Sequence, residues 1–249
     1  MNKQVIILAA GKGSRMKVDK PKVLVEILGK PMIEYVLDSV KIVQSMVKPV
    51  VVVGHQGELV QDKIKDRATI VWQKEQLGTG HAVAIARNIF LNFSGAILVL
   101  YGDHPLISPK TIEKLFKIHE ERNSVLSLMT TEVEDFTDWR SSFMEFGRII
   151  RDNDNHIQSI REFKDCSDAE KKIKEVNPGY YCFDSVWLWQ NIQKLQNKNN
   201  QKEYYLTDLI SLAVAQNEKI SSIQIPPLEC LGVNTSEQLQ MVENLIKNK

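Results

Sequence analysis

Cysteine is scarce in this chain, and neither sign of charge is in excess. The three cysteines, Cys166, Cys182 and Cys230, are odd in number, lie far apart and form no CxxC pair. A disulfide framework or a zinc site is therefore not expected, and three ordinary buried thiols in a reducing cytoplasm fit best. The formal net charge is +1, and neither half is markedly basic or acidic. This balance argues against bulk electrostatic binding to nucleic acid or membrane.

Long apolar runs are also missing. The apolar stretch of residues 5–10 ends at Gly11 after six residues, which is too short for the hydrophobic region of a signal peptide. No run approaches the roughly 20 residues that a membrane-spanning helix needs. We therefore expect a soluble, cytoplasmic protein without a membrane partner, acting as a monomer or weak dimer. With 249 residues, 43% of them hydrophobic, the chain can bury a sizeable core.

The first half alternates short β-branched runs with stretches of helical periodicity. Strands are predicted at residues 4–9, 50–53, 69–72 and 96–100, and helices at 31–43, 57–64, 79–90 and from Pro109 onward. Thr79 and Ser108 are the expected caps of the last two helices. This alternation is typical of βαβ units, which build a mainly parallel sheet.

The second half has shorter strands and more loops. Strands are predicted at residues 125–131, 148–151, 156–162, 175–183 and 220–225, and helices at 184–194, 206–216 and from Ser236. We expect one continuous α/β body, to which the second half adds a substrate lobe.

The sharpest motif is the loop after the first predicted strand. It runs Leu8-Ala9-Ala10-Gly11-Lys12-Gly13-Ser14-Arg15-Met16, with Pro21-Lys22 just beyond. Its small residues let backbone N–H groups approach a ligand closely, and Arg15 and Lys22 add two cations suited to a polyphosphate. Met16 replaces the third glycine of a dinucleotide fingerprint, and no GxxxxGK[ST] sequence occurs. The pattern favours a phosphate-binding loop over a simple tight turn.

Asp103 follows the predicted strand at residues 96–100. Open α/β sheets bind ligands at the carboxyl ends of their strands. A carboxylate there suits Mg²⁺, which prefers oxygen ligands and usually takes one or two protein groups plus phosphates. None of the five histidines is paired with Ser or Cys in a recognisable nucleophile motif. His104, beside Asp103, is the only one that we expect near a site.

The loop closely resembles the activating loop of sugar-1-phosphate nucleotidyltransferases. The rest of the chain is most similar to the uridylyltransferase (pyrophosphorylase) domain of the bifunctional N-acetylglucosamine-1-phosphate uridylyltransferases, the GlmU family. Further motifs follow in the order of that family: Gln73 with residues 75–82, Tyr101-Gly102-Asp103-x-Pro105-Leu106, Gly147-Arg148, Asn177-x-Gly179, Glu203-Tyr204-Tyr205-x-Thr207-Asp208 and Gly232-Val233-Asn234. The resemblance covers nearly the whole chain. It implies a Rossmann-like nucleotide-diphospho-sugar transferase fold, with a mainly parallel or mixed central sheet flanked by helices. It also implies a single domain over residues 1–249, with a nucleotide-binding half at 1–123 and a sugar-binding half at 124–249.

The resemblance further implies a role for individual residues. Arg15 and Lys22 would be catalytic, and Asp103 and Asn234 would hold Mg²⁺. The nucleotide, UTP, would contact Leu8, Ala9, Ala10, Gly11, Gly13, Gln73, Gln76, Gly78 and Thr79. The sugar phosphate would contact Tyr101, Gly102, Gly147, Glu162, Asn177, Tyr205 and Thr207. Taken alone, Gln73 and Glu162 would be interpreted as solvated side chains, and Asn234 equally well as the N-cap of the final helix.

The implied reaction is direct attack of a sugar 1-phosphate oxygen on the α-phosphorus of UTP. The second phosphate pKa is about 6, so the nucleophile is largely dianionic at pH 7 and needs no general base. One alternative is a uridylyl- or thymidylyltransferase for another hexose 1-phosphate. A second is a non-catalytic nucleotide-sugar sensor, which the presence of Arg15, Lys22, Asp103 and Asn234 disfavours.

The chain departs from the family at several points. Residues 136–146 form a longer segment than usual before Gly147, and Arg161, Phe163 and Pro178 replace an apolar residue, His and Thr. These changes surround the expected sugar pocket, so they bear on the choice of sugar more than on the chemistry. His104 stands where a small apolar residue is more common. The sequence ends at Lys249 without hexapeptide repeats, so the family's β-helical acetyltransferase and its trimer are not expected.

Overall fold

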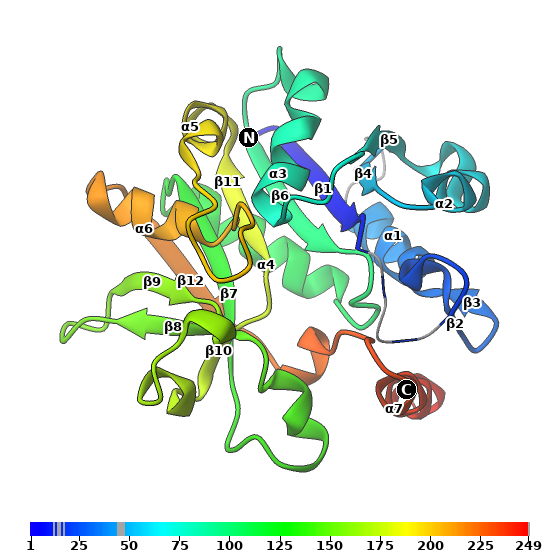
Figure 1. Ribbon diagram of the computed structural model, residues 1–249. Coiled ribbons are helices and arrows are strands. Elements are labelled where there is room, and N and C mark those ends of the chain that lie inside the picture. Colours follow the sequence, from blue (N-terminus) through cyan, green and yellow to red (C-terminus); the bar gives the residue numbers. More distant parts are fainter. Residues whose placement is uncertain (12, 14–15, 17, 44–47, 249) are drawn as a thin grey trace.

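A ten-stranded mixed sheet runs through the computed structural model, which describes residues 1–11, 13, 16, 18–43 and 48–248. The strand order is β5-β4-β1-β6-β11-β7-β10-β8-β9, and β12 also pairs with β7 (Figure 1). The strands are β1 (Lys3–Ala9), β4 (Val50–Val53), β5 (Thr69–Trp72), β6 (Ala96–Tyr101), β7 (Leu126–Glu132), β8 (Gly147–Arg151), β9 (Ile157–Arg161), β10 (Glu175–Asn177), β11 (Tyr181–Asp184) and β12 (Ile220–Gln224). A separate two-stranded hairpin consists of β2 (Glu26–Ile27) and β3 (Lys30–Pro31).

Most of the parallel pairing lies in the first half of the chain, as predicted, and in the second half β12 pairs in parallel with β7. Strand β1 pairs in parallel with both β4 and β6, and β4 pairs in parallel with β5. Strand β6 then pairs antiparallel with β11 of the second half, and β7, β8, β9 and β10 continue with antiparallel pairs. One sheet therefore crosses the expected boundary between the two halves.

Helices cover both faces of this sheet. They are α1 (Met32–Val43), α2 (Gly57–Ile64), α3 (Thr79–Ala84), α4 (Pro109–Glu121), α5 (Ser185–Asn191), α6 (Asp208–Ala215) and α7 (Ser236–Lys247). Alternate residues of β1 divide between two cores: Val5 and Ile7 pack with α1, α2 and α4, whereas Ile6 and Leu8 pack with α3, α5 and α6. This burial on both faces explains why β4 and residues 5–9 of β1 are uniformly apolar. Of the helices in the described part of the chain, none has the length and apolar character that a membrane crossing requires.

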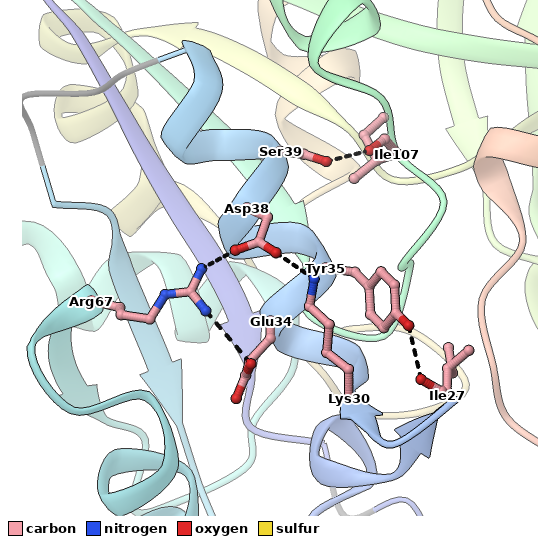
Figure 2. A network of polar contacts seen from close by, with 8 residues as sticks. All are labelled: Ile27, Lys30, Glu34, Tyr35, Asp38, Ser39, Arg67 and Ile107. Atoms are coloured by element: carbon pink, nitrogen blue, oxygen red, sulfur yellow. Dashed lines mark hydrogen bonds and ion pairs between the residues drawn. The ribbon is translucent and has the colours of Figure 1, made fainter. Parts of the chain in front are cut away.

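A charged network anchors α1 to its neighbours (Figure 2). The Asp38 carboxylate accepts hydrogen bonds from Lys30, on the β2–β3 hairpin, and from Arg67, just after α2. Burial alone would raise the pKa of Asp38, but the hydrogen bonds from Lys30 and Arg67 lower it. The Tyr35 hydroxyl donates to the Ile27 carbonyl over 2.8 Å. Helix α1 is thus fixed to the β2–β3 hairpin, which follows the glycine-containing loop after β1.

Three local predictions differ from the structure. Residues 175–183 form two strands, because Pro178 has no N–H to donate and Gly179 adopts a φ of +87° between them. The predicted helix at 79–90 is α-helical only to Ala84 and then becomes the 3₁₀ segment η4 (Ile85–Phe90). The predicted cap is also wrong, because Gly78 occupies the N-cap position of α3.

The remaining 3₁₀ segments are η2 (Lys22–Leu24), η3 (Lys65–Arg67), η5 (Asp138–Phe143), η6 (Phe163–Asp165), η7 (Glu170–Lys172), η8 (Ile192–Lys194) and η9 (Pro227–Cys230). The three cysteines are buried, unpaired thiols, as the sequence predicted. Ser108 caps α4 as predicted, with its hydroxyl accepting from the Thr111 N–H over 3.2 Å.

Candidate active site

A cavity of about 600 Å³ lies at the carboxyl ends of β1 and β6. These strands are neighbours in the sheet, yet the chain forms β4 and β5 between them. The connections leave such a point in opposite directions, which opens a crevice at the strand ends. Eight of the nine residues that were expected to bind the nucleotide line this cavity: Leu8, Ala9, Ala10, Gly11, Gln73, Gln76, Gly78 and Thr79.

Lys22, Asp103 and Asn234 converge in the same cavity. The Lys22 ammonium forms a salt bridge with Asp103 Oδ2 and donates to Asn234 Oδ1 over 2.7 Å. Asp103 comes from the end of β6, and Asn234 precedes α7, so the topology brings together residues that lie far apart in the sequence. Arg15, the other predicted catalytic cation, lies outside the described residues.

The pair of Lys22 and Asp103 is largely shielded from solvent, with side-chain exposures of 15% and 12%. Burial alone would raise the pKa of Asp103, but the Lys22 ammonium lowers it, so the carboxylate is ionised. Two oxygen atoms, one of them anionic, therefore face a single cationic group. This arrangement can hold a cation of either kind, an ammonium or a hard metal ion.

Asn234 is not the cap of the final helix. Thr235 caps α7 instead, in a capping box with Gln238. The alternative interpretation of Asn234 as an N-cap is therefore wrong. Its side-chain oxygen instead accepts a hydrogen bond from Lys22.

Two glutamine side chains organise the loop before α3, and one of them bridges it to the loop that follows β1. Gln73 is buried at 4% exposure, which contradicts its interpretation as a surface residue, and its Nε2 donates to the Gly78 carbonyl over 3.1 Å. Gln76 Nε2 donates to the Ala10 carbonyl over 3.0 Å. Gly54 permits this bridge, because a Cβ at that position would lie 2.6 Å from the Ala10 oxygen.

The same loop is joined to the second half of the chain. Tyr204 donates its N–H to the Leu77 carbonyl, and its own carbonyl accepts from the Gly80 N–H, both over 2.8 Å. The Thr79 hydroxyl accepts from the Leu206 N–H over 3.1 Å. Residues 204–206 are thus fixed to the loop that lines the first cavity.

A second cavity of about 530 Å³ adjoins the first and shares Tyr101, His104 and Asn234 with it. Four of the residues that were expected to bind the sugar phosphate line it: Tyr101, Gly147, Glu162 and Asn177. Burial raises the pKa of Glu162, although the hydrogen bond that its Oε1 accepts from the Thr207 hydroxyl over 3.1 Å opposes this. A half-buried acceptor of this kind suits the hydroxyl groups of a hexose.

The other predicted contact residues support the cavity walls. Gly102 donates its N–H to the Leu8 carbonyl over 2.9 Å, and Tyr205 accepts from the Gln201 side chain over 2.8 Å. Thr207 holds Glu162, as described above. Gly13 packs against Lys22, since a Cβ at Gly13 would lie 2.7 Å from the Cβ of Lys22.

One wall of the second cavity consists of residues to which the sequence analysis gave no individual role. It consists of Ser141, Ser142, Met144, Glu145 and Phe146, together with Thr235 and Gln238. The unusual length of residues 136–146 was the available signal. The buried Arg148 guanidinium organises this segment by donating to the Met144 carbonyl over 2.9 Å and to the Phe146 carbonyl, and by lying 4.6 Å from the centre of the Phe136 ring. Burial lowers the pKa of Arg148.

Comparison with known proteins gives a consistent result. Residues 5–203 match the MobA-like NTP transferase domain family. The chain is 41% identical to the bifunctional protein GlmU of Alkaliphilus metalliredigens, over 100% of this chain and 53% of that protein. It is 40% identical to the bifunctional protein GlmU of Desulfotalea psychrophila, over 98% of this chain and 70% of that protein. The chain thus spans about half the length of most curated relatives that it matches.

A crystal structure from Bacillus anthracis, assigned as a glucose-1-phosphate thymidylyltransferase and determined with sucrose, superposes with a TM-score of 0.73. The superposition covers 100% of this chain and 96% of that one, at 18% sequence identity. At this identity the similarity establishes the nucleotidyltransferase fold.

Proposed function

Because this chain belongs to the MobA-like NTP transferase domain family, we propose that it is a sugar-1-phosphate nucleotidyltransferase. Its reaction would join N-acetylglucosamine 1-phosphate to UTP and release pyrophosphate and UDP-N-acetylglucosamine. The observation that carries this proposal is the convergence of Lys22, Asp103 and Asn234 where two adjoining cavities meet. The relatives named GlmU support the uridylyltransferase assignment, because the motifs of this chain resemble that family.

The first cavity would hold the nucleotide. Its volume of about 600 Å³ is within the range of small-molecule sites. Because the Nε2 of the buried Gln73 amide is held by Gly78 and His81, its Oε1 would accept from the N–H at the edge of a uracil base. The backbone of Ala10 and Gly11 would face the phosphates, since small residues let the main chain approach them.

A divalent cation such as Mg²⁺ fits the donor set of the site. Asp103 Oδ2 and Asn234 Oδ1 both face one cationic atom, Lys22 Nζ, so two oxygens already converge as a hard metal requires. Among the described residues, no group of three or more His, Cys, Asp or Glu side chains could hold a metal. The other ligands would be phosphate oxygens and water. When bound, the ion would supply charge neutralisation to the phosphates.

The chemistry would then consist of positioning and charge stabilisation. A new bond forms between the sugar phosphate oxygen and the α-phosphorus, and the bond from that phosphorus to the oxygen of pyrophosphate breaks. Lys22 would lie close enough to the phosphates to stabilise the charge on the departing pyrophosphate. Arg15, outside the described residues, is expected to share this role.

The second cavity would hold the sugar, with Glu162 and Asn177 presented to its hydroxyl and acetamido groups. A second candidate is a transferase for another hexose 1-phosphate or for dTTP. It is favoured by the wall built from residues 141–146 and by the assignment of the structural neighbour as a glucose-1-phosphate thymidylyltransferase.

Pyrophosphate release with a panel of triphosphates and sugar 1-phosphates tests these proposals. We expect the highest kcat/KM for UTP with N-acetylglucosamine 1-phosphate, and loss of turnover when EDTA removes divalent metal. A preference for glucose 1-phosphate or dTTP would favour the second candidate. No turnover with any pair, despite binding of UDP-sugars, would indicate a sensor and overturn the enzymatic proposal.

A further inference from the structure

His104 forms part of the partition between the two cavities, and it lines both of them. The side chain is buried, with 8% exposure of the residue. Its ring stacks on Tyr101, with centroids 5.4 Å apart and planes at 30°, and lies 6.5 Å from Phe146 at 14° on another side. The edge contact with Tyr180 has a centroid distance of 5.4 Å. The imidazole is therefore held in one orientation.

A hydrogen-bond chain assigns the tautomer of this ring. The Tyr180 hydroxyl donates to the Glu229 carbonyl over 3.1 Å, and a tyrosine hydroxyl has only one proton to donate. The contact of 2.8 Å between Tyr180 and His104 Nδ1 must then be donated by Nδ1–H. In the neutral imidazole, a proton on Nδ1 leaves a lone pair on Nε2.

Nε2 faces the part of the partition next to Asn234. A Cβ at Gly232 would lie 2.7 Å from His104 Nε2 and 3.6 Å from Asn234 Nδ2, so glycine leaves room for both groups. No described residue forms a hydrogen bond with Nε2. Tyr101 and Phe146 stack with the ring, and Tyr180 contacts Nδ1. The edge that carries Nε2 is therefore the part of His104 that is left to line the two cavities.

We propose that His104 is a positioning residue that uses Nε2 to accept a hydrogen bond from a hydroxyl group of the sugar phosphate. This inference rests on the proposed function. Ionised phosphate groups offer no donor to such a lone pair, whereas a hexose has a hydroxyl on nearly every carbon. The Phe146 ring, which stacks with His104, lines the second cavity and not the first, which favours the sugar over the nucleotide as the donor. His104 would then select for a sugar that has its hydroxyl at this point.

Three variants separate hydrogen bonding from packing. His104→Phe keeps an aromatic ring in the stack but has no acceptor, and His104→Gln can return an amide oxygen near the position of Nε2. His104→Ala removes both ring and acceptor. We expect His104→Phe to raise KM for the sugar 1-phosphate about three- to tenfold, as loss of one hydrogen bond does, with KM for the triphosphate within about twofold. His104→Gln should recover part of the loss.

Deoxy and deoxyfluoro analogues of the sugar 1-phosphate identify the hydroxyl. With the unmodified enzyme, the analogue that lacks the contacted hydroxyl should have a KM about three- to tenfold higher than the parent sugar 1-phosphate. With His104→Phe, that analogue and the parent sugar should have about the same KM. An unchanged KM for the sugar in His104→Phe, or a change in KM for the triphosphate alone, would overturn the inference. The latter would indicate a contact with the ribose.

A failure of the proposed enzymatic function can be distinguished from a failure of the inference about His104. If the unmodified enzyme turns over no substrate pair, calorimetric binding of UDP-N-acetylglucosamine and its deoxy analogues replaces KM. Weaker binding by His104→Phe, restored by His104→Gln, still supports the contact, and equal binding by all three proteins refutes it. Melting temperatures measured in parallel identify any variant that fails to fold.

Discussion

Replacing Asp103 with asparagine tests the charge arrangement of the site with the least change in shape. The substitution removes one negative charge and leaves Lys22 facing two amide groups. Because water can replace little of the lost interaction at 12% exposure, we expect a loss typical of a charge-assisted hydrogen bond in a shielded site. Turnover should fall at least ~100-fold, which corresponds to about 2.7 kcal/mol of transition-state stabilisation.

Stability should change much less than activity. Removing one partner of a buried ion pair costs about 3–5 kcal/mol when the remaining charge is left alone. Here Lys22 retains the Asn234 oxygen at 2.7 Å, and its side chain is 15% exposed. We therefore expect a loss of only about 1–2 kcal/mol, which lowers the melting temperature by roughly 2–8 °C in a chain of this size.

The assay is pyrophosphate release at saturating substrates, with calorimetric melting of each protein. Asp38→Asn is the matched control, because Asp38 is also held by a lysine yet lines neither cavity. It should melt a few degrees lower and keep near-normal turnover. If Asp103→Asn kept more than about a tenth of the activity, or lost it only in proportion to its instability, the proposed charge arrangement would be refuted.

Three further outcomes are expected. Gly179→Ala should lower the stability by about 2–3 kcal/mol in calorimetry, since its φ of +87° and a Cβ 2.3 Å from Tyr101 Cε2 both oppose a side chain; an unchanged melting temperature would contradict this. Burial raises the pKa of Glu162 above its ordinary 4.5, so the stability that its protonated form contributes is lost as the pH rises through that raised pKa. Glu162→Gln, which can still accept from Thr207, should thus melt at a higher temperature than the unmodified protein at pH 7 but not at pH 4. A lower melting temperature of the variant at pH 7 would contradict the raised pKa. Lys22→Met should bind Mn²⁺ about tenfold more tightly in the ligand-free state, by electron paramagnetic resonance, because the competing ammonium is gone; weaker binding would exclude such competition.

The parallel half of the fold was predictable from the sequence. Strands β4 and β5 and helix α2 begin and end at the predicted residues. Strand β4 is buried on both faces and uniformly apolar, and Gly54 follows its last residue. The division of residues 175–183 into two strands was not predicted, because Pro178 and Gly179 interrupt a segment whose other residues favour a strand. The local sequence also could not predict the hydrogen bond from the Leu206 N–H to the Thr79 hydroxyl, because these residues are 127 positions apart.

The candidate site was predictable as a set of residues but not as a geometry. The motifs identified both loops that line the first cavity. They did not show that Lys22 would lie between Asp103 and Asn234, because the contacts span 81 and 212 positions and depend on the order of the strands. The partition formed by His104 depends similarly on residues 136–146, whose conformation follows from the burial of Arg148.

The hydrogen bonds that join residues 77–80 to residues 204–206 also have a consequence for the binding equilibria of the two substrates. Through Thr207 and Glu162, they form a continuous set of contacts from the first cavity to the second. A ligand that orders one end reduces the entropy that a second ligand must lose at the other. Synergy between the two substrates would then be reciprocal: each would tighten the binding of the other by the same factor.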